Sequence, residues 1–156
     1  MKKETINIGI LGLGTVGQGV IRVLQENKEF IEQKIYPKKI VLKKLADKDK
    51  TKILPDKKLY KIFTDSAEEI INDPEIDIVV ETIGGLEPAK SLIMQALKEG
   101  KHVVTANKEV ITKAGYEILD LARKHKVQFL FEASVASGIP IIGAFTHSLT
   151  SYKLKE

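Results

Sequence analysis

The sequence predicts an α/β fold, a doubly wound and mostly parallel sheet with helices on both faces. Three observations support this prediction. Apolar strand candidates alternate with helical periodicities along the 156-residue chain, an order that favours parallel strands joined by helical crossovers. Residues 76–81 (IDIVVE) are mostly apolar, as in strands that are covered on both faces. Three closely spaced glycines separate the first predicted strand from the first predicted helix.

The predicted strands are short apolar runs bounded by polar or turn-forming residues. They span residues 5–11, 39–46, 60–63, 76–81, 102–105 and 127–131. Between the second and third strands, the polar residues 48–58 contain Pro55 and are predicted to form a loop.

The predicted helices follow from periodicity and from end signals. An apolar stripe at residues 16, 20, 23 and 24 predicts a helix from Thr15 to about Asn27. Ser66, with Glu69 three residues later, is a capping-box signal for a short helix that ends near Pro74. The other helices are predicted to run from Pro88 to Gly100, through residues 118–126, and over residues 138–149.

Composition restricts the class of protein. A hydrophobic fraction of 43% in 156 residues suits one globular domain with a real core. Cysteine is absent, which excludes disulfides, a thiol nucleophile and a thiolate metal site. No apolar run approaches the roughly 20 residues of a membrane span. We therefore expect a cytoplasmic protein that does not associate with membranes.

The positive charge comes almost entirely from lysine. The formal net charge is +4, and only Arg22 and Arg123 among the 25 basic residues are arginine. Residues 38–61 hold ten lysines against three aspartates. A nucleic-acid reader favours arginine and aromatic residues, so we expect no nucleic-acid partner and favour a solvated lysine-rich surface. The alternative is a nucleic-acid binder that uses residues 38–61, and its affinity would fall steeply with salt.

The three glycines have the spacing G-x-G-x-x-G, at Gly12, Gly14 and Gly17. Between a strand and a helix, this spacing is typical of a Rossmann-type dinucleotide site. The first glycine permits the turn, the second lets the backbone approach the pyrophosphate, and the third lets the helix pack close to the strand. The amides from about Thr15 would then point at the phosphates. The alternative is a glycine-rich turn without a ligand.

The end of the second strand carries conflicting signals for the cofactor. Asp47 favours NAD, because an acid there accepts a hydrogen bond from the ribose 2′-hydroxyl, whereas Lys48 and Lys50 favour the 2′-phosphate of NADP. The lysine excess of residues 38–61 favours NADP, with NAD or dual use left open. Each lysine has the alternative of a solvated loop position.

Two further strand ends would lie at the ligand-binding edge of the sheet. Residues 82–85 (TIGG) follow one strand, and backbone there could approach a ribose or nicotinamide. Lys108 follows another and could contact substrate or the cofactor ribose. A surface lysine is the alternative for Lys108.

Four segments together resemble homoserine dehydrogenase: GLGTVG at 12–17, DIVVETIGG at 77–85, HVVTANK at 102–108 and EASVASGIPII at 132–142. They occur in the family's order along nearly the whole chain. The resemblance implies an oxidoreductase that interconverts aspartate 4-semialdehyde and L-homoserine with NADPH or NADH. That reaction belongs to threonine, methionine and isoleucine biosynthesis.

The resemblance also implies roles for individual residues. Lys108 would lie near nicotinamide and substrate as a catalytic residue, and Lys48 matches the basic residue that usually ends the family's second strand. Asp47 before it is less usual, which leaves the preference for NADP open. The implied cofactor-binding residues are Gly12, Leu13, Gly14, Thr15, Val16, Gly17, Asp47, Lys48, Thr82, Thr105 and Lys108.

In some members of the family the EASV-x-x-GIP segment binds a monovalent cation such as sodium. The ligands here would be Glu132, Val135, Ser137 and Ile139. The alternative is that Glu132 caps a helix or pairs with a lysine.

The family's later NGT-x-N segment, its acidic substrate-binding residues and its proton-donating lysine do not occur in this sequence. We therefore expect residues 1–150 to be an NAD(P)-binding domain and residues 151–156 to begin the connection to a catalytic and dimerisation domain. The full-length protein would be a homo-oligomer, and this fragment alone would turn over little substrate. The alternatives are a non-catalytic dinucleotide-sensing module and the cofactor domain of another amino-acid-related NAD(P) dehydrogenase.

Overall fold

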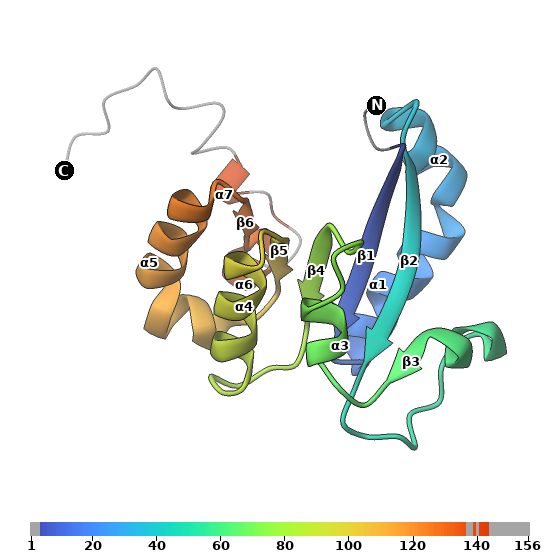
Figure 1. The fold of residues 1–156 in the computed structure, drawn as a ribbon, viewed down its shortest axis with the longest axis horizontal. Coiled ribbons are helices and arrows are strands. Elements are labelled where there is room, and N and C mark those ends of the chain that lie inside the picture. Colours follow the sequence, from blue (N-terminus) through green and yellow to red (C-terminus); the bar gives the residue numbers. More distant parts are fainter. Residues whose placement is uncertain (1–3, 137–138, 140, 144–156) are drawn as a thin grey trace.

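A computed structural model of the chain describes residues 4–136, 139 and 141–143. Within them one sheet of parallel strands runs in the order β3-β2-β1-β4-β5-β6 (Figure 1). The strands are β1 (Thr5–Leu11), β2 (Lys39–Ala46), β3 (Phe63–Thr64), β4 (Ile78–Glu81), β5 (His102–Thr105) and β6 (Phe129–Leu130). The predicted α/β, doubly wound parallel sheet is confirmed.

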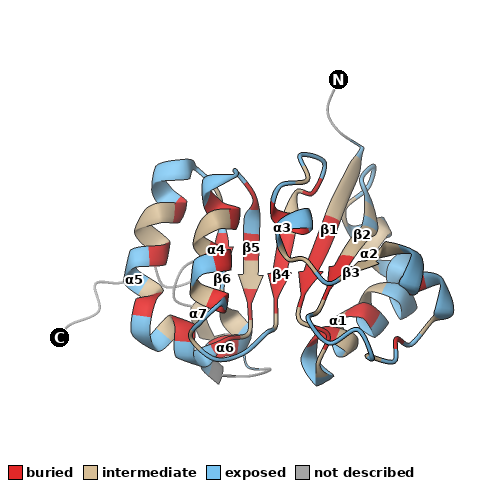
Figure 2. Cartoon of the chain, turned by 60° about the horizontal axis from the view of Figure 1, so that its bottom comes forward, coloured by how far each residue is buried: buried red, intermediate tan, exposed pale blue. Residues whose placement is uncertain are grey.

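Helices cover both faces of this sheet, and each face has its own core. The helices are α1 (Thr15–Glu26), α2 (Lys28–Lys34), η1 (Lys57–Ile62), α3 (Glu68–Ile71), α4 (Ala89–Lys98), α5 (Lys108–His125), α6 (Glu132–Ala136) and α7 (Ile141–Gly143). Ile21 of α1 packs with alternate strand residues such as Ile8 and Ile10 on one face. Ile93 of α4 and Ile118 of α5 pack on the other (Figure 2).

The strand order reverses between β1 and β4. From β1 the chain moves outward through β2 to β3, and it then returns to place β4 on the other side of β1. In open parallel sheets, ligands bind outside the carboxyl ends of the strands at such a reversal. The glycine turn after Leu11 and the turn after Glu81 therefore lie side by side at the edge where a ligand is expected.

The apolar stripe predicted for α1 is partly wrong. Val16 and Val23 are 53% and 54% exposed, whereas Ile21 is fully buried. The reason is the contact at Gly17, which lies against the carbonyl of Gly12. That contact turns the face carrying Gly17 and Ile21 toward the sheet.

Two local predictions also need correction. Residues 57–62 form the 3₁₀ helix η1, where a strand was expected to begin at Tyr60, and Asp56 accepts a hydrogen bond from the Lys58 amide at its start. The helix predicted after Ser66 forms as α3, but without a side-chain cap. The helix α6 was not predicted. Of the helix expected over residues 138–149, residues 141–143 form α7, and residues 138, 140 and 144–149 lie outside the described residues.

Within the described part of the chain, no helix combines the length and the apolar character needed to span a membrane.

Candidate functional site

Two of the three motif glycines are required by the fold itself. Gly12 has a φ of +90°, and a Cβ there would lie 2.7 Å from the backbone of Thr82. A Cβ on Gly17 would lie 2.1 Å from the Gly12 carbonyl oxygen. Side chains at these positions would separate α1 from the turn and from the end of β4, so both glycines serve the close packing that the motif predicts.

Gly14 is different, because nothing in the described protein occupies the space beside it. A Cβ on Gly14 would have no neighbour within 4 Å, and its φ of −73° is one that any residue can adopt. Gly14 begins α1, a helix without a side-chain cap and without an acidic residue in its first turn. The amides at this helix start therefore face open space, which is the arrangement that binds a phosphate group.

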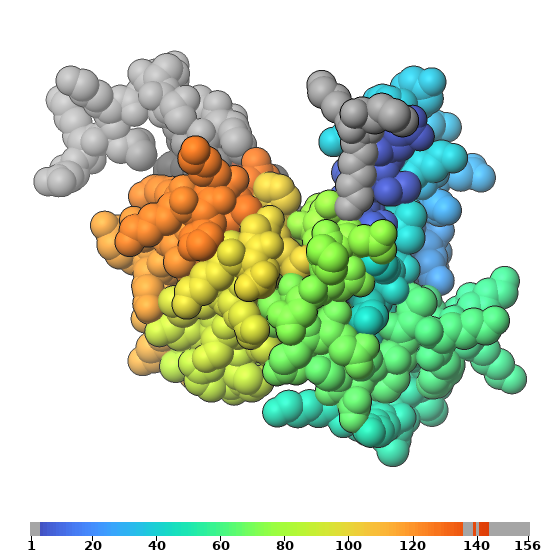
Figure 3. Space-filling view, viewed as in Figure 1, coloured from blue at the N-terminus to red at the C-terminus, as the bar shows by residue number. Residues whose placement is uncertain are grey.

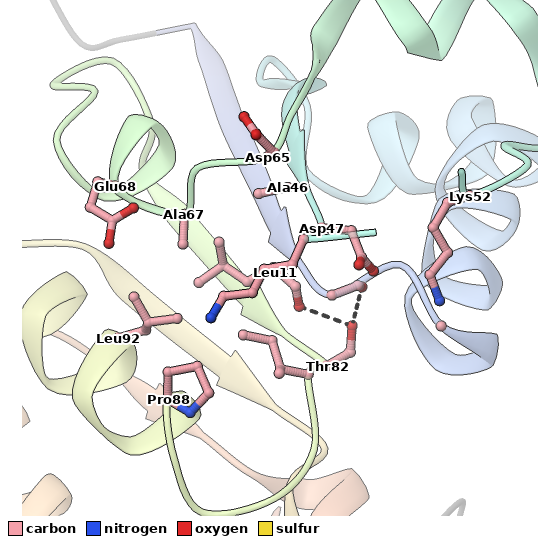
Figure 4. Close-up of a pocket in the computed structure, with 14 residues that line it drawn as sticks. Leu11, Ala46, Asp47, Lys52, Asp65, Ala67, Glu68, Thr82, Pro88 and Leu92 are labelled. Carbon is pink, nitrogen blue, oxygen red and sulfur yellow. Dashed lines mark hydrogen bonds between the residues drawn. The ribbon is translucent and has the colours of Figure 1, made fainter. Parts of the chain in front are cut away.

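A pocket of about 350 Å³ opens beside this loop (Figure 4). Its walls come from the ends of β1 and β2, the β3–α3 connection, the turn after β4 and the start of α4. The lining residues are Leu11, Gly12, Gly14, Ala46, Asp47, Lys48, Lys52, Asp65, Ala67, Glu68, Thr82, Ile83, Pro88 and Leu92. Apolar walls with a few charged groups at the rim suit a flat ring system attached to a polar sugar.

The lysines of residues 38–61 differ in their surroundings. Lys50 lies 2.6 Å from Asp65, and the hydrogen bond from Lys50 lowers the pKa of that carboxyl below its ordinary value. Lys48 and Lys52 line the pocket and form no ion pair within 4.0 Å among the described residues. The teal segment that carries them lies along the bottom of Figure 3.

Asp47 and Thr82 both point toward the glycine loop (Figure 4). The Asp47 carboxylate accepts hydrogen bonds from the amides of Leu13 (2.6 Å) and Asp49 (2.9 Å). The Thr82 hydroxyl lies 2.7 Å from the Gly12 carbonyl oxygen and 3.2 Å from that of Leu11, and it donates to this pair. Both predicted cofactor-binding residues line the pocket and support the turn between β1 and α1.

A buried polar network that the sequence reasoning did not predict lies next to this edge. Glu81 is fully buried, and its carboxylate accepts hydrogen bonds from the Ile83 amide (2.7 Å) and the Thr105 hydroxyl. That hydroxyl in turn accepts from the Asn107 amide. Ser134 donates to the Thr105 carbonyl at 3.0 Å. The predicted cofactor residue Thr105 is thus 1% exposed and has its hydroxyl inside the network.

Asn107 connects the network to the two remaining candidate segments, residues 82–85 and the helix start at Lys108. Its side chain accepts from the Val110 amide as the cap of α5, and it donates to the Gly85 carbonyl at 2.7 Å. Residues 82–85 are therefore held at Ile83 by Glu81 and at Gly85 by Asn107. Lys108 follows as the exposed first residue of α5. An asparagine just before a helical pattern is a sequence signal that could have identified this cap.

The residues of the expected cation site are only partly described. Both carboxylate oxygens of Glu132 accept amide hydrogen bonds, one from Ile142 (2.8 Å) and one from Gly143 (2.9 Å). These bonds agree with the alternative that Glu132 caps a helix. Val135 and Ile139 are exposed, and Ser137 lies outside the described residues. No three histidine, aspartate or glutamate side chains cluster as metal ligands in the described part of the chain.

The strand order, the glycine loop and the uncapped start of α1 define a protein of the dinucleotide-binding class. The family model described as "Homoserine dehydrogenase, NAD binding domain" matches residues 12–132. The chain belongs to this family, as the resemblance of its motifs predicted.

Individual relatives agree with this result. Homoserine dehydrogenase of Synechocystis is 44% identical over 97% of this chain, and that of Bacillus subtilis is 36% identical over 98%. The crystal structure of a homoserine dehydrogenase from Thiobacillus denitrificans superimposes with a TM-score of 0.82 at 44% identity, over 94% of this chain and 34% of that one. A hyperthermophilic archaeal homoserine dehydrogenase in complex with NADPH superimposes with a TM-score of 0.72 at 26% identity, over 90% of this chain and 47% of that one.

The chain spans about a third of the length of these curated relatives, 34% for the Synechocystis protein and 35% for the Bacillus protein. The match is therefore to their nucleotide-binding part.

Proposed function

We propose that the chain binds NADP(H) or NAD(H), with NADP(H) favoured, as the cofactor-binding part of a homoserine dehydrogenase. The full-length protein would interconvert aspartate 4-semialdehyde and L-homoserine. The bound cofactor would supply the hydride, while this chain would bind and orient it. Residues 1–150 would form the cofactor domain, with residues 151–156 leading toward a substrate domain.

The observation that carries this proposal is the open space at Gly14. The described part of the fold gives no steric reason for glycine there, because a Cβ would meet none of the described atoms within 4 Å. A ligand that approaches the backbone closely supplies such a reason. The uncapped α1 amides beside Gly14 select an anion, and the cofactor's diphosphate is the anion that this motif binds in dinucleotide sites.

The remaining roles are assigned by position. Lys48 and Lys52 would face the adenosine side of the cofactor, where a 2′-phosphate would meet two lysines that form no ion pair within 4.0 Å among the described residues. Thr82 and the turn that follows it would lie on the nicotinamide side, beyond β1. Lys108 would contact the nicotinamide or substrate from the start of α5. The sodium site at Glu132 stays a prediction, as do cytoplasmic location and homo-oligomerisation of the full-length protein.

Calorimetric titration with NADPH and with NADH tests the proposal on three proteins. The wild type should bind, and Gly14→Val should lose at least tenfold in affinity for both dinucleotides, because the valine would occupy the space of the diphosphate. The matched control is Gly19→Val, since a Cβ at Gly19 also meets nothing within 4 Å but lies further along α1.

The control should bind like the wild type. Equal affinities for wild type and Gly14→Val would contradict the assigned site, and a wild type that binds neither dinucleotide would contradict the function.

A further inference from the structure

Asp47 occupies the position at which dinucleotide-binding folds usually read the ribose. An acid at the end of the second strand normally accepts a hydrogen bond from the ribose 2′-hydroxyl and thereby favours NAD. In this structure Asp47 has a different partner. One carboxylate oxygen accepts from the Leu13 amide at 2.6 Å, and the other accepts from the Asp49 amide at 2.9 Å. Leu13 is the buried residue between Gly12 and Gly14.

We propose that Asp47 is a positioning residue of the glycine loop and not the residue that chooses between NAD and NADP. This inference rests on the proposed dinucleotide function. By holding the Leu13 amide, Asp47 fixes the backbone on which Gly14 and the first amides of α1 are presented to the diphosphate.

The other contacts of the loop support this role. Gly12 donates its amide to the Ala46 carbonyl at 2.9 Å, and its own carbonyl accepts from the Thr82 hydroxyl. The Leu13 carbonyl accepts from the Gln18 side chain at 3.2 Å. With the bond from Leu13 to Asp47, every backbone donor and acceptor of Gly12 and Leu13 has a partner. The loop is thus held in place before any ligand arrives.

The charge of Asp47 makes the role testable. A carboxylate in the same pocket repels an anionic cofactor, so removing a carboxylate that only reads the ribose should preserve or improve NADPH binding. Removing a carboxylate that holds the loop should weaken NADPH binding as well as NADH binding, because the backbone amides lose their alignment. The two roles therefore predict opposite changes in the affinity for NADPH when Asp47 is replaced.

The experiment compares Asp47→Ala with Asp120→Ala by calorimetric titration at one salt concentration. Asp120 is the control, because Asp120→Ala also removes one carboxylate, and Asp120 pairs with Lys124 on α5 and is not among the residues that line the pocket. We expect Asp47→Ala to weaken the binding of NADPH and of NADH alike by about tenfold, the effect of losing one charge-assisted hydrogen bond. Asp120→Ala should not weaken NADPH binding. A selective loss of NADH binding in Asp47→Ala, with NADPH unchanged or tighter, would overturn the proposal.

A second measurement needs no cofactor. Amide hydrogen exchange at Leu13 should be at least tenfold faster in Asp47→Ala than in the wild type, while the amide of Ile10 in β1 keeps its protection and reports an intact fold. Unchanged exchange at Leu13 would also overturn the proposal. If the wild type bound neither dinucleotide, the proposed function would fail, and exchange at Leu13 would still decide whether Asp47 holds the loop.

Discussion

At the scale of single residues, Gly17 determines how closely α1 can approach the sheet. A Cβ at this position would lie 2.1 Å from the Gly12 carbonyl and 2.8 Å from the Thr82 hydroxyl. Neither the backbone of Gly12 nor the end of β4 can move away without disturbing the loop. The position is therefore structural, in contrast to Gly14.

We predict that Gly17→Ala lowers the free energy of unfolding by about 1–3 kcal/mol, the usual cost of overpacking a core. The matched control is Gly115→Ala in α5, where the new Cβ would make an ordinary 3.6 Å contact with Ile111. That control should be stabilised by roughly 0.5–1 kcal/mol through helix propensity. Urea denaturation measures the free energy of unfolding of both variants. A Gly17→Ala protein as stable as the wild type would contradict the close packing of α1 described for Gly17.

A second prediction at this scale concerns the lysines of the pocket. Lys52→Ala should weaken the binding of NADPH about fivefold and leave the binding of NADH nearly unchanged. The reason is that a partly exposed cation interacts with a 2′-phosphate that only NADPH carries. Lys50→Ala is the control, since Lys50 is already paired with Asp65. Fluorescence titration of the reduced cofactors measures the two affinities. Equal losses for NADPH and NADH in Lys52→Ala would exclude Lys52 as a phosphate ligand.

At the scale of elements, the turn after β4 and the start of α5 behave as one unit through Asn107. Its side chain caps α5 at Val110 and donates to Gly85, and the residue is 6% exposed. Residues 82–85 and Lys108 are thus positioned by the same buried side chain.

We predict that Asn107→Ala lowers the free energy of unfolding by about 2 kcal/mol, the sum of a lost cap and an unsatisfied carbonyl. Ser66→Ala is the comparison, because the capping box predicted at Ser66 does not form and α3 has no side-chain cap. Its effect should stay within about 0.5 kcal/mol. If both variants lost the same stability in urea denaturation, the cap at Asn107 would not have the role described.

The elements also show what the sequence could and could not predict. The bounds of β1, β2 and β5 follow from local apolar runs, and they match the predicted ranges. The rotation of α1 depends on the contact between Gly17 and Gly12, and the two-residue strand β3 exists only through its pairing with Leu45 and Ala46. Such contacts between distant segments produce no periodic pattern in the local sequence, so they could not be predicted from it.

The same limit applies to the site. The glycine loop and the residues at the strand ends could be predicted, because the topology places every carboxyl strand end at one edge. Hydrogen bonds could not be predicted from spacing. The bond between Asp47 and the Leu13 amide left no signal in the sequence, and Glu81, which was taken as the end of an apolar strand, lies at the centre of a buried network.

At the scale of the whole molecule, carboxylates with lowered pKa values contribute to the response to acid. Lys50 lowers the pKa of Asp65, and hydrogen bonds from Thr64 and then Lys44 lower the pKa of Glu69. A carboxyl whose folded pKa is depressed contributes stability above its unfolded pKa near 4, and this contribution is lost as the pH falls through the folded value.

We therefore predict that the free energy of unfolding decreases as the pH falls below about 4. In Asp65→Asn this decrease should be smaller, since the variant has one fewer group that binds a proton on unfolding. Urea denaturation at a series of pH values measures the slope. An unfolding free energy that rises on acidification would contradict the ion pairs described here.

For the whole molecule, we propose that the edge formed by the ends of β1, β2 and β4 is a dinucleotide site. The most direct test is a crystal structure of the chain grown with excess NADPH. We expect the diphosphate to lie against the amides of Gly14 and Thr15, with the 2′-phosphate facing Lys48 and Lys52. A crystal in which NADPH lies elsewhere, or in which protein side chains fill the space beside Gly14, would contradict it.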